Sequence, residues 1–124
     1  MNGQFTIIQF DVDWENSWRD VENWDAAWIF VKYKRAGRIW QHASLAPRDE
    51  DHGAPGGAVI DVGVTDGVGK GVFLYRSSPG SGAANYQGVR LHWNYGQDNV
   101  GDDELVQVKV FAVEMVSIPQ GTPI

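Results

Sequence analysis

Apolar and polar residues alternate over several short stretches of this 124-residue chain, and each such stretch predicts a β-strand. Residues 5–14 carry an apolar face that runs from Ile8 to Trp14. Residues 26–35 are apolar on both faces in their first half and on one face in their second half, which is typical of a central strand whose far end reaches solvent. Similar patterns predict strands at residues 38–45, 58–64, 71–76, 88–95 and 105–118.

Turn-forming residues separate these stretches and indicate the fold class. Ala36-Gly37 and Asp66-Gly67 are hairpin signals. Loops rich in Gly, Pro or acidic residues are expected at 47–57, 77–85 and 96–104. Seven or eight short strands without a convincing helix predict an all-β, antiparallel β-sandwich of the jelly-roll or immunoglobulin-like kind. We expect one domain over residues 1–118 and a C-terminal tail over residues 119–124.

Tryptophan is concentrated near the start of the chain, where Trp14, Trp18, Trp24 and Trp28 account for four of the six. The spacing within the pairs Trp14/Trp18 and Trp24/Trp28 would fit one face of a helix. The residues between them are Asn, Ser, Asp and Arg, however, and Asn, Ser and Asp favour turns by bonding their own backbone. The sequence therefore predicts a strand that ends near Trp14, followed by a polar loop that carries Trp18 and Trp24.

The composition excludes several classes of function. A net charge of −6 disfavours a nucleic-acid partner, which requires a basic face. Cysteine is absent, so disulfides, thiol catalysis and thiolate metal sites are excluded. The first ten residues lack a basic region followed by an apolar run, so we expect no secretory signal. No stretch has the ~20 apolar residues of a membrane span, so we expect no membrane insertion.

Catalytic residues are not expected. His42, His52 and His92 fall in different predicted elements, and no serine lies in a Gly-x-Ser-x-Gly motif. The carboxylates of Asp11 and Asp13 share one face of a strand and are the best acid–base candidates. A solvated outer face explains them more simply, because no apolar neighbour would raise a pKa. A small hydrolase is the least favoured hypothesis.

Aromatic side chains are the best candidates for contact with a ligand or partner. Six Trp and four Tyr exceed what a core of this size needs, and such rings stack on sugars and anchor protein interfaces. Strand parity assigns Trp14, Trp28 and Trp93 to the core. The predicted contact residues, which lie in loops or at loop edges, are Trp18, Trp24, Trp40, Tyr86 and Tyr95.

A calcium site is a further hypothesis, and no other cofactor is expected. One loop gathers hard oxygen ligands of the kind that Ca²⁺ prefers. Its candidate ligands are Asp98, Asn99, Asp102 and Asp103, with Glu104 beside them. Acidic surface loops without a metal are the commoner outcome, and the spacing does not match a helix–loop–helix calcium site.

Several segments resemble a β-rich module of bacterial proteins. In those proteins the module directly precedes a domain of the formylglycine-generating (sulfatase-modifying factor) family. The resemblance covers most of residues 14–121 and rests on NSWRDVENWDAAWIFVKYK, IWQHASL, GVFLYRS, VRLHWNYG and VKVFAVEMVSIPQG. Because the chain contains no cysteine, we expect neither the active site of that following domain nor its oxidase activity here. Related C-type-lectin-like domains also serve as display and receptor-binding proteins, which implies a scaffold or adaptor role.

These observations favour a non-catalytic structural or interaction module. It would contact protein partners or copies of itself through the Trp-rich loop and the long final strand. A phage virion or an extracellular bacterial assembly is the expected setting. The alternative is a carbohydrate-binding module in which Trp18, Trp24, Trp40 and Tyr95 stack on sugar rings, with Ca²⁺ in the acidic loop.

Overall fold

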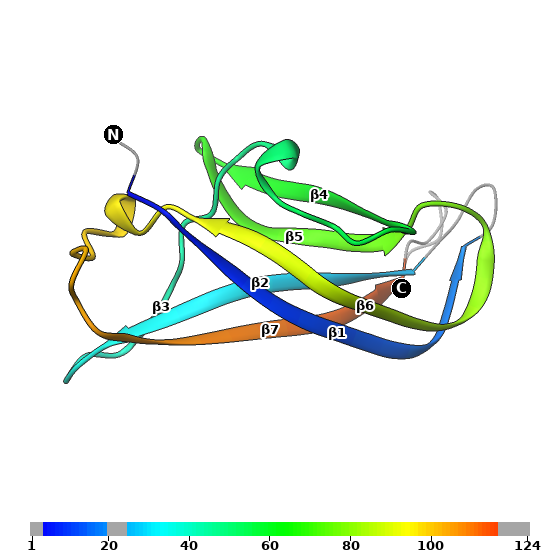
Figure 1. The fold of residues 1–124 in the computed structure, drawn as a ribbon, viewed down its shortest axis with the longest axis horizontal. Helices are drawn as coiled ribbons and strands as arrows, with labels where there is room; N and C mark the ends of the chain where they lie inside the picture. Colours follow the sequence, from blue (N-terminus) through cyan, green and yellow to red (C-terminus); the bar gives the residue numbers. More distant parts are fainter. Residues whose placement is uncertain (1–3, 20–24, 117–124) are drawn as a thin grey trace.

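The computed structural model describes residues 4–19 and 25–116, which form seven β-strands and two short 3₁₀ turns. The elements are β1 Thr6–Arg19, β2 Asp25–Arg35, β3 Trp40–His42, η1 Asp49–Asp51, β4 Ala58–Thr65, β5 Val68–Arg76, β6 Gly80–Trp93, η2 Tyr95–Asp98 and β7 Val106–Val116. All strand pairs are antiparallel. The predicted all-β antiparallel sandwich is confirmed (Figure 1). The predicted tail at residues 119–124 lies outside the described residues.

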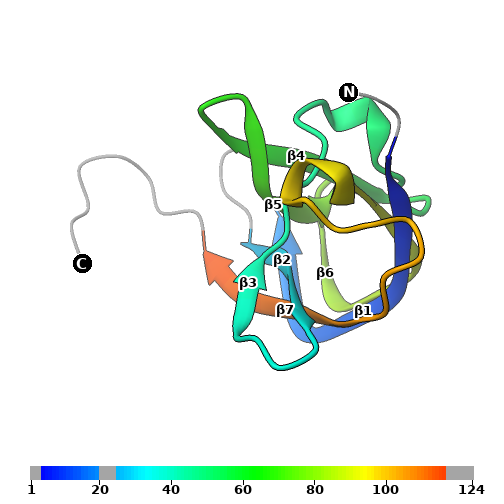
Figure 2. The same ribbon diagram turned by 90° about the vertical axis from the view of Figure 1, so that its left-hand side faces the viewer.

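The strands form two layers. β1 pairs with β6 and forms the first sheet. In the second sheet, β3 and β5 both pair with one edge of β2, β4 pairs with β5, and β7 pairs with the opposite edge of β2. Figure 2 shows β1 and β6 on one side of the molecule and β2, β3 and β7 on the other. β2 pairs with β7 over its whole length, with β5 near its start and with β3 near its end. It is therefore the central strand, as its two-faced apolar pattern predicts.

The core lies between the two layers and follows strand parity. Ile29 and Val31 of β2 are fully buried, as are Val72 of β5 and Val89 and Leu91 of β6. Burying one such side chain contributes roughly 1.5–3 kcal/mol to stability. The apolar face of β1 is half-buried against this cluster.

The segment between β3 and β4 joins the two sheets on one side. The backbone N–H of Leu45 donates to Gly69 of β5 (2.9 Å), and that of Ala46 donates to His92 of β6 (3.0 Å). A Cβ at Gly69 would lie 2.8 Å from the Leu45 carbonyl oxygen, so glycine permits this approach. On the opposite side, β1 and β7 form no ladder with each other in the described residues.

His52 fastens the same segment to β6. Its Nδ1 accepts the backbone N–H of His92 (3.1 Å), and its Nε2 lies 2.9 Å from the carbonyl oxygen of Ala46. Nδ1 must be unprotonated to accept and Nε2 must carry hydrogen to donate, so these contacts select one neutral tautomer. Burial, opposed by the bond to Ala46, lowers the pKa of His52 below its ordinary value.

A buried polar cluster connects the layers at the other end. Asp25 of β2 is 1% exposed, and its carboxylate accepts Trp14 Nε1–H (2.8 Å) and the Ser17 hydroxyl (3.1 Å) of β1. The guanidinium of Arg76 in β5 donates through Nε to the Ser17 hydroxyl oxygen (3.0 Å) and through Nη2 to the Gly82 carbonyl oxygen of β6 (3.1 Å). Four strands therefore meet in one hydrogen-bonded network.

Three sequence-based boundaries were wrong. β1 continues to Arg19 instead of ending near Trp14. A register shift between Trp14 and Ser17 accommodates the polar residues there, and Asp25 accepts a hydrogen bond from the Ser17 hydroxyl. β6 begins at Gly80, within the loop predicted at 77–85, where small residues pair with the end of β1. The strand predicted at 38–45 is limited to three residues, because the following segment turns to join β5 and β6.

Replacing Asp25 with Ala should destabilise the fold strongly. The substitution removes the acceptor of the half-buried Trp14 indole N–H and of the buried Ser17 hydroxyl, at about 1–3 kcal/mol each, so the free energy of unfolding should fall by roughly 2–6 kcal/mol. Urea denaturation measures this change. The matched control is Asp13→Ala, because Asp13 is an exposed residue of β1. Its free energy of unfolding should change by no more than about 0.5 kcal/mol. Equal denaturation midpoints for the two variants would show that the network does not stabilise the fold.

His52 should make stability depend on pH just below neutrality. Because its pKa is lower in the folded than in the unfolded state, the unfolded chain takes up the proton first as pH falls. The His52 contribution is therefore fully present above the unfolded value of about 6.5 and declines as pH falls through it. His52→Gln keeps a donor and an acceptor without titrating, so it should flatten thermal stability between about pH 7.5 and 5.5. A His52→Gln variant that keeps the wild-type slope would contradict this assignment.

Candidate interaction surface

The structure places two of the predicted contact residues at a half-exposed surface. Trp40 lies in β3, where the ammonium of Lys109 sits 4.8 Å from its ring centroid. Tyr95 lies in η2, and its hydroxyl donates to Asp102 Oδ1 (2.7 Å). Trp24 and the side chain of Trp18 lie outside the described residues, so their exposure stays a prediction.

Tyr86 was wrongly expected at an exposed loop edge. It lies inside β6, is 7% exposed, and packs edge-on against Trp14 at 5.7 Å between ring centroids. The cause is a bulge: Phe10 faces Val89 and Val12 faces Tyr86, so two β6 residues oppose one β1 residue. Gly88, with φ +76°, allows this bulge, which reverses the parity of the strand and turns Tyr86 inward.

Asp98, the first residue of the predicted calcium site, is used by the fold. Oδ2 accepts the backbone N–H of Ser44 (2.9 Å) and Nε1–H of Trp93 (2.8 Å), and Oδ1 accepts the Ser44 hydroxyl (2.6 Å). These bonds fasten η2 to the segment that joins the sheets. The Asp98 carboxylate is thus already satisfied by protein donors.

The rest of that loop is held in the same way. Asp102 accepts hydrogen bonds from Gln4 and Tyr95, and Glu104 pairs with Arg35 at 2.8 Å. The Asn99 carbonyl accepts from Arg35 as well, whereas Asp103 is exposed. No three acidic or histidine side chains among the described residues converge on a point that could hold a metal. The calcium hypothesis for Asp98, Asn99, Asp102 and Asp103 therefore gains no support.

The acid–base candidates also serve the backbone. Asp11 Oδ1 accepts the N–H of Gly88 (2.8 Å), and both ring nitrogens of His52 contact backbone groups. Asp13 is exposed on the outer face of β1. The absence of catalytic activity stays a prediction.

The outer side of the five-stranded sheet carries an unusual number of apolar side chains. In a two-layer antiparallel sandwich this side ordinarily meets solvent and is polar. Here Val113 is 50% exposed, Met115 44%, Phe111 38% and Phe73 37%. We call the whole set the outer apolar face; it comprises Trp28, Phe30, Phe73, Phe111, Val113 and Met115.

Trp28 is seated at the centre of this face by two glycines. Gly63 and Gly71 are paired across β4 and β5, and the six-membered ring of Trp28 occupies the space above them. A Cβ at Gly71 would lie 2.6 Å from the ring, and one at Gly63 would lie 2.9 Å from it. Phe73 packs on the same ring with centroids 4.7 Å apart.

A ladder of stacked rings crosses the same face. Phe30 stacks on Phe111 at 5.1 Å and 7°, and on His42 at 5.3 Å and 10°. The three rings lie on β7, β2 and β3, so the ladder crosses three strands, directly from Phe111 to Phe30 and diagonally from Phe30 to His42. Parallel stacking covers the ring faces with one another, which suits contact with a protein better than stacking on a sugar.

A row of lysines borders the outer apolar face. Lys32 faces Lys109 on one side and His42 on the other, and Lys34 lies two residues farther along β2. Like charges that face each other across strands destabilise a sheet. Among the described residues, no carboxylate forms an ion pair with Lys32, Lys34 or Lys109. The lysine row is therefore a concentrated positive patch on an acidic protein.

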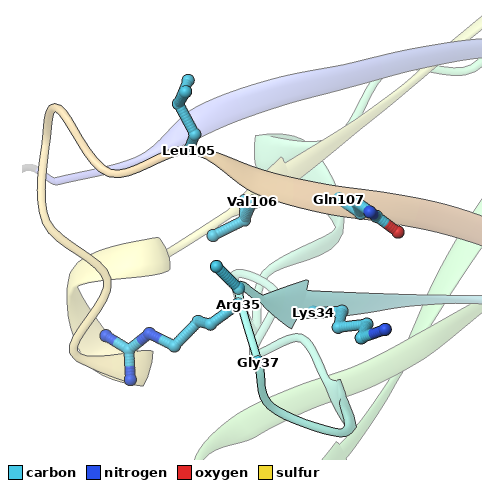
Figure 3. A pocket seen from close by; sticks show the side chains of 7 residues that line it. Lys34, Arg35, Gly37, Leu105, Val106 and Gln107 are labelled. Carbon is cyan, nitrogen blue, oxygen red and sulfur yellow. The ribbon is translucent and has the colours of Figure 1, made fainter.

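The hollow drawn in Figure 3 lies where β2 ends and β7 begins. It has a volume of about 290 Å³ and is lined by residues 34–37 and 105–107. Leu105 is 91% exposed, and Arg35 turns toward Glu104, with which it is paired. No group of polar side chains converges there, so it does not resemble a small-molecule site.

Sequence reasoning missed most of the outer apolar face. Trp28 was assigned to the core, and Phe30, Phe73 and Phe111 were not singled out. The available signal was the apolar pattern on both faces of residues 26–31 and 106–116, which exceeds what one core can cover.

No protein-family model matches the chain, and no curated protein or solved structure is significantly similar to it. The resemblance to the module that precedes formylglycine-generating-type domains therefore stays a prediction. The described part of the chain contains no apolar helix of membrane-spanning length.

Gly71→Ala should destabilise the protein by about 1–3 kcal/mol, because the new methyl group would overlap Trp28 and lie 2.8 Å from the backbone oxygen of Ile29. Thermal denaturation provides the measurement. Gly56→Ala is the matched control: no heavy atom lies within 4 Å of a Cβ there, so stability should be unchanged or slightly higher. An unaltered melting temperature for Gly71→Ala would contradict the proposed seating of Trp28.

Proposed function

We propose that this chain is a non-catalytic interaction module that binds another protein through the outer apolar face. The observation that carries the proposal is the contiguous exposure of Phe73, Phe111, Val113 and Met115 on one side of a sheet. Large exposed apolar patches are uncommon on monomeric proteins and are typical of protein–protein interfaces.

The lysine row indicates the chemistry of the partner. Lys32 and Lys109 face each other without a carboxylate partner in the described residues, so an external anionic group would relieve their repulsion. A surface with an apolar centre and carboxylates at its border would complement both features. A phage virion or an extracellular bacterial assembly is the setting that we propose for such a partner.

The carbohydrate-binding alternative has less support. The rings of Phe30, Phe111 and His42 cover one another, and Lys109 lies over Trp40. The hydroxyl of Tyr95 is bonded to Asp102. The half-exposed aromatic residues thus already have partners within the chain.

Site-specific photo-cross-linking tests the proposal. A benzophenone amino acid in place of Phe73 lies on the outer apolar face but away from the β7 edge. In the organism that encodes the chain, it should give one defined cross-linked product with another protein. The same group at exposed Asn85 of β6, on the other layer, should not. Equal products from both positions, or none from position 73, would contradict the proposal.

Charge reversal provides a second readout. Lys32→Glu should abolish the cross-link from position 73 while the protein remains folded by circular dichroism, because it removes the attraction for partner carboxylates. Lys70→Glu changes the net charge by the same amount outside the lysine row and should leave the product unchanged. A cross-link that survives Lys32→Glu would exclude the lysine row from the interface.

A further inference from the structure

Free strand edges invite pairing with other chains, and most edges of this fold are protected against it. β1 has two register shifts and the carboxylates of Asp11, Asp13 and Glu15. β4 has a register shift, and the side chain of Asp49 accepts the Val62 N–H (2.8 Å). β3 is only three residues long. Bulges, charges and short length are the usual forms of protection.

β7 has no bulge and is not short, and its charged side chains are those of Lys109 and Glu114. It pairs with β2 over 11 residues without a register shift, contains no proline, and pairs with no other described strand (Figure 1). A hollow of about 360 Å³ separates its first residues, Val106 and Val108, from Thr6 and Ile8 of β1. The second edge of β7, 11 residues and about 36 Å long, is therefore unpaired within the described part of the chain.

Lys109 could have guarded this edge, since lysine is a common edge protector. Its ammonium instead lies 4.8 Å from the ring of Trp40, which is on β3 beyond β2. The side chain is thus drawn across the sheet and away from the free edge.

The sequence of β7 is suited to pair with itself. In an antiparallel register centred on Phe111, that residue faces Phe111 of the second copy, and Lys109 faces Val113 of the second copy. No like charges face each other in this register, and the two Lys109 residues are four positions apart along the strand. That separation is about 13 Å, beyond the Debye length of about 8 Å at physiological ionic strength.

This register also continues the ring ladder. His42, Phe30 and Phe111 are stacked at 5.1–5.3 Å, close to the 4.7–4.9 Å between paired strands. Phe111 of the second copy would occupy the next step, and the ladder would run through six rings. β7 carries one Lys and one Glu, so two copies would meet at a neutral strand although each chain has a net charge of −6.

We propose that β7 is a self-association edge: two copies of the chain pair their β7 strands antiparallel around Phe111 and form a continuous sheet. This inference goes beyond the proposed function, because it concerns the free edge of β7 and its occupant is a second copy. The dimer would leave the two outer apolar faces side by side, open to another protein.

The absence of cysteine allows a direct test. A single Phe111→Cys would place two thiols across the twofold axis, with Cα atoms about 4.5–5.5 Å apart, which a disulfide can bridge. Mild oxidation should convert this variant to a covalent dimer of twice 13.8 kDa. Phe73→Cys is the matched control, since its position is 37% exposed against 38% for Phe111 but lies in β5 away from the edge. It should remain monomeric.

Substitutions at Val113 test the register. In this register residue 113 of each copy faces Lys109 of the other copy, so each dimer contains two such pairs. Val113→Glu would make both pairs oppositely charged, and Val113→Lys would make both pairs like-charged. The dimer dissociation constant, from light scattering or analytical ultracentrifugation, should fall for Glu and rise for Lys, each by roughly 2- to 30-fold. Equal effects of both would overturn the register.

A wild-type protein that stays monomeric at all accessible concentrations, with no selective cross-link at position 111, would overturn the proposal. That result would leave the proposed function standing, because the cross-link from position 73 to another protein does not depend on the β7 edge. A dimer that forms as predicted, without a photo-cross-link from position 73 to another protein, would instead overturn the proposed function and support the self-association edge.

Discussion

The carboxylate of Asp25 is the point on which the arrangement of the two layers depends. The hydrophobic effect is non-directional, so apolar packing alone would stabilise two sheets in many relative positions. Hydrogen bonds from Trp14 and Ser17 to a carboxylate that is 1% exposed are directional, and they fix β1 against the start of β2. Arg76 extends the same network to β5 and β6, so one set of hydrogen bonds fixes the positions of all four strands relative to one another.

The fold class and the central strand could be predicted from the sequence because they depend on local alternation and on turn residues. The errors arose where a distant partner changed the local preference. Ser17 would favour a turn in isolation, but a buried carboxylate from β2 makes a strand position acceptable. Tyr86 was misplaced because the bulge at Gly88 reverses the side to which residues point, and a bulge depends on pairing with β1.

The candidate surface was only partly predictable for a related reason. The long final strand was identified as a contact element, and its alternating valines are visible in the sequence. Which of its two apolar faces meets the other layer is decided by its register with β2, where Phe30 faces Phe111. The seat of Trp28 is formed by glycines from β4 and β5, which no local pattern connects with a tryptophan in β2.

The pairing scheme also bears on how the chain reaches its folded state. β1 pairs with β6 and β2 pairs with β7, so each early strand has its main partner in the last third of the described chain. Such non-local pairing gives a high contact order, for which folding in milliseconds to seconds is typical. During synthesis the apolar strand β2 must wait for residues 106–116 to leave the ribosome before its longest ladder can form. Until then the growing chain is exposed to misassembly, and the protection of its edges is most valuable before the fold is complete.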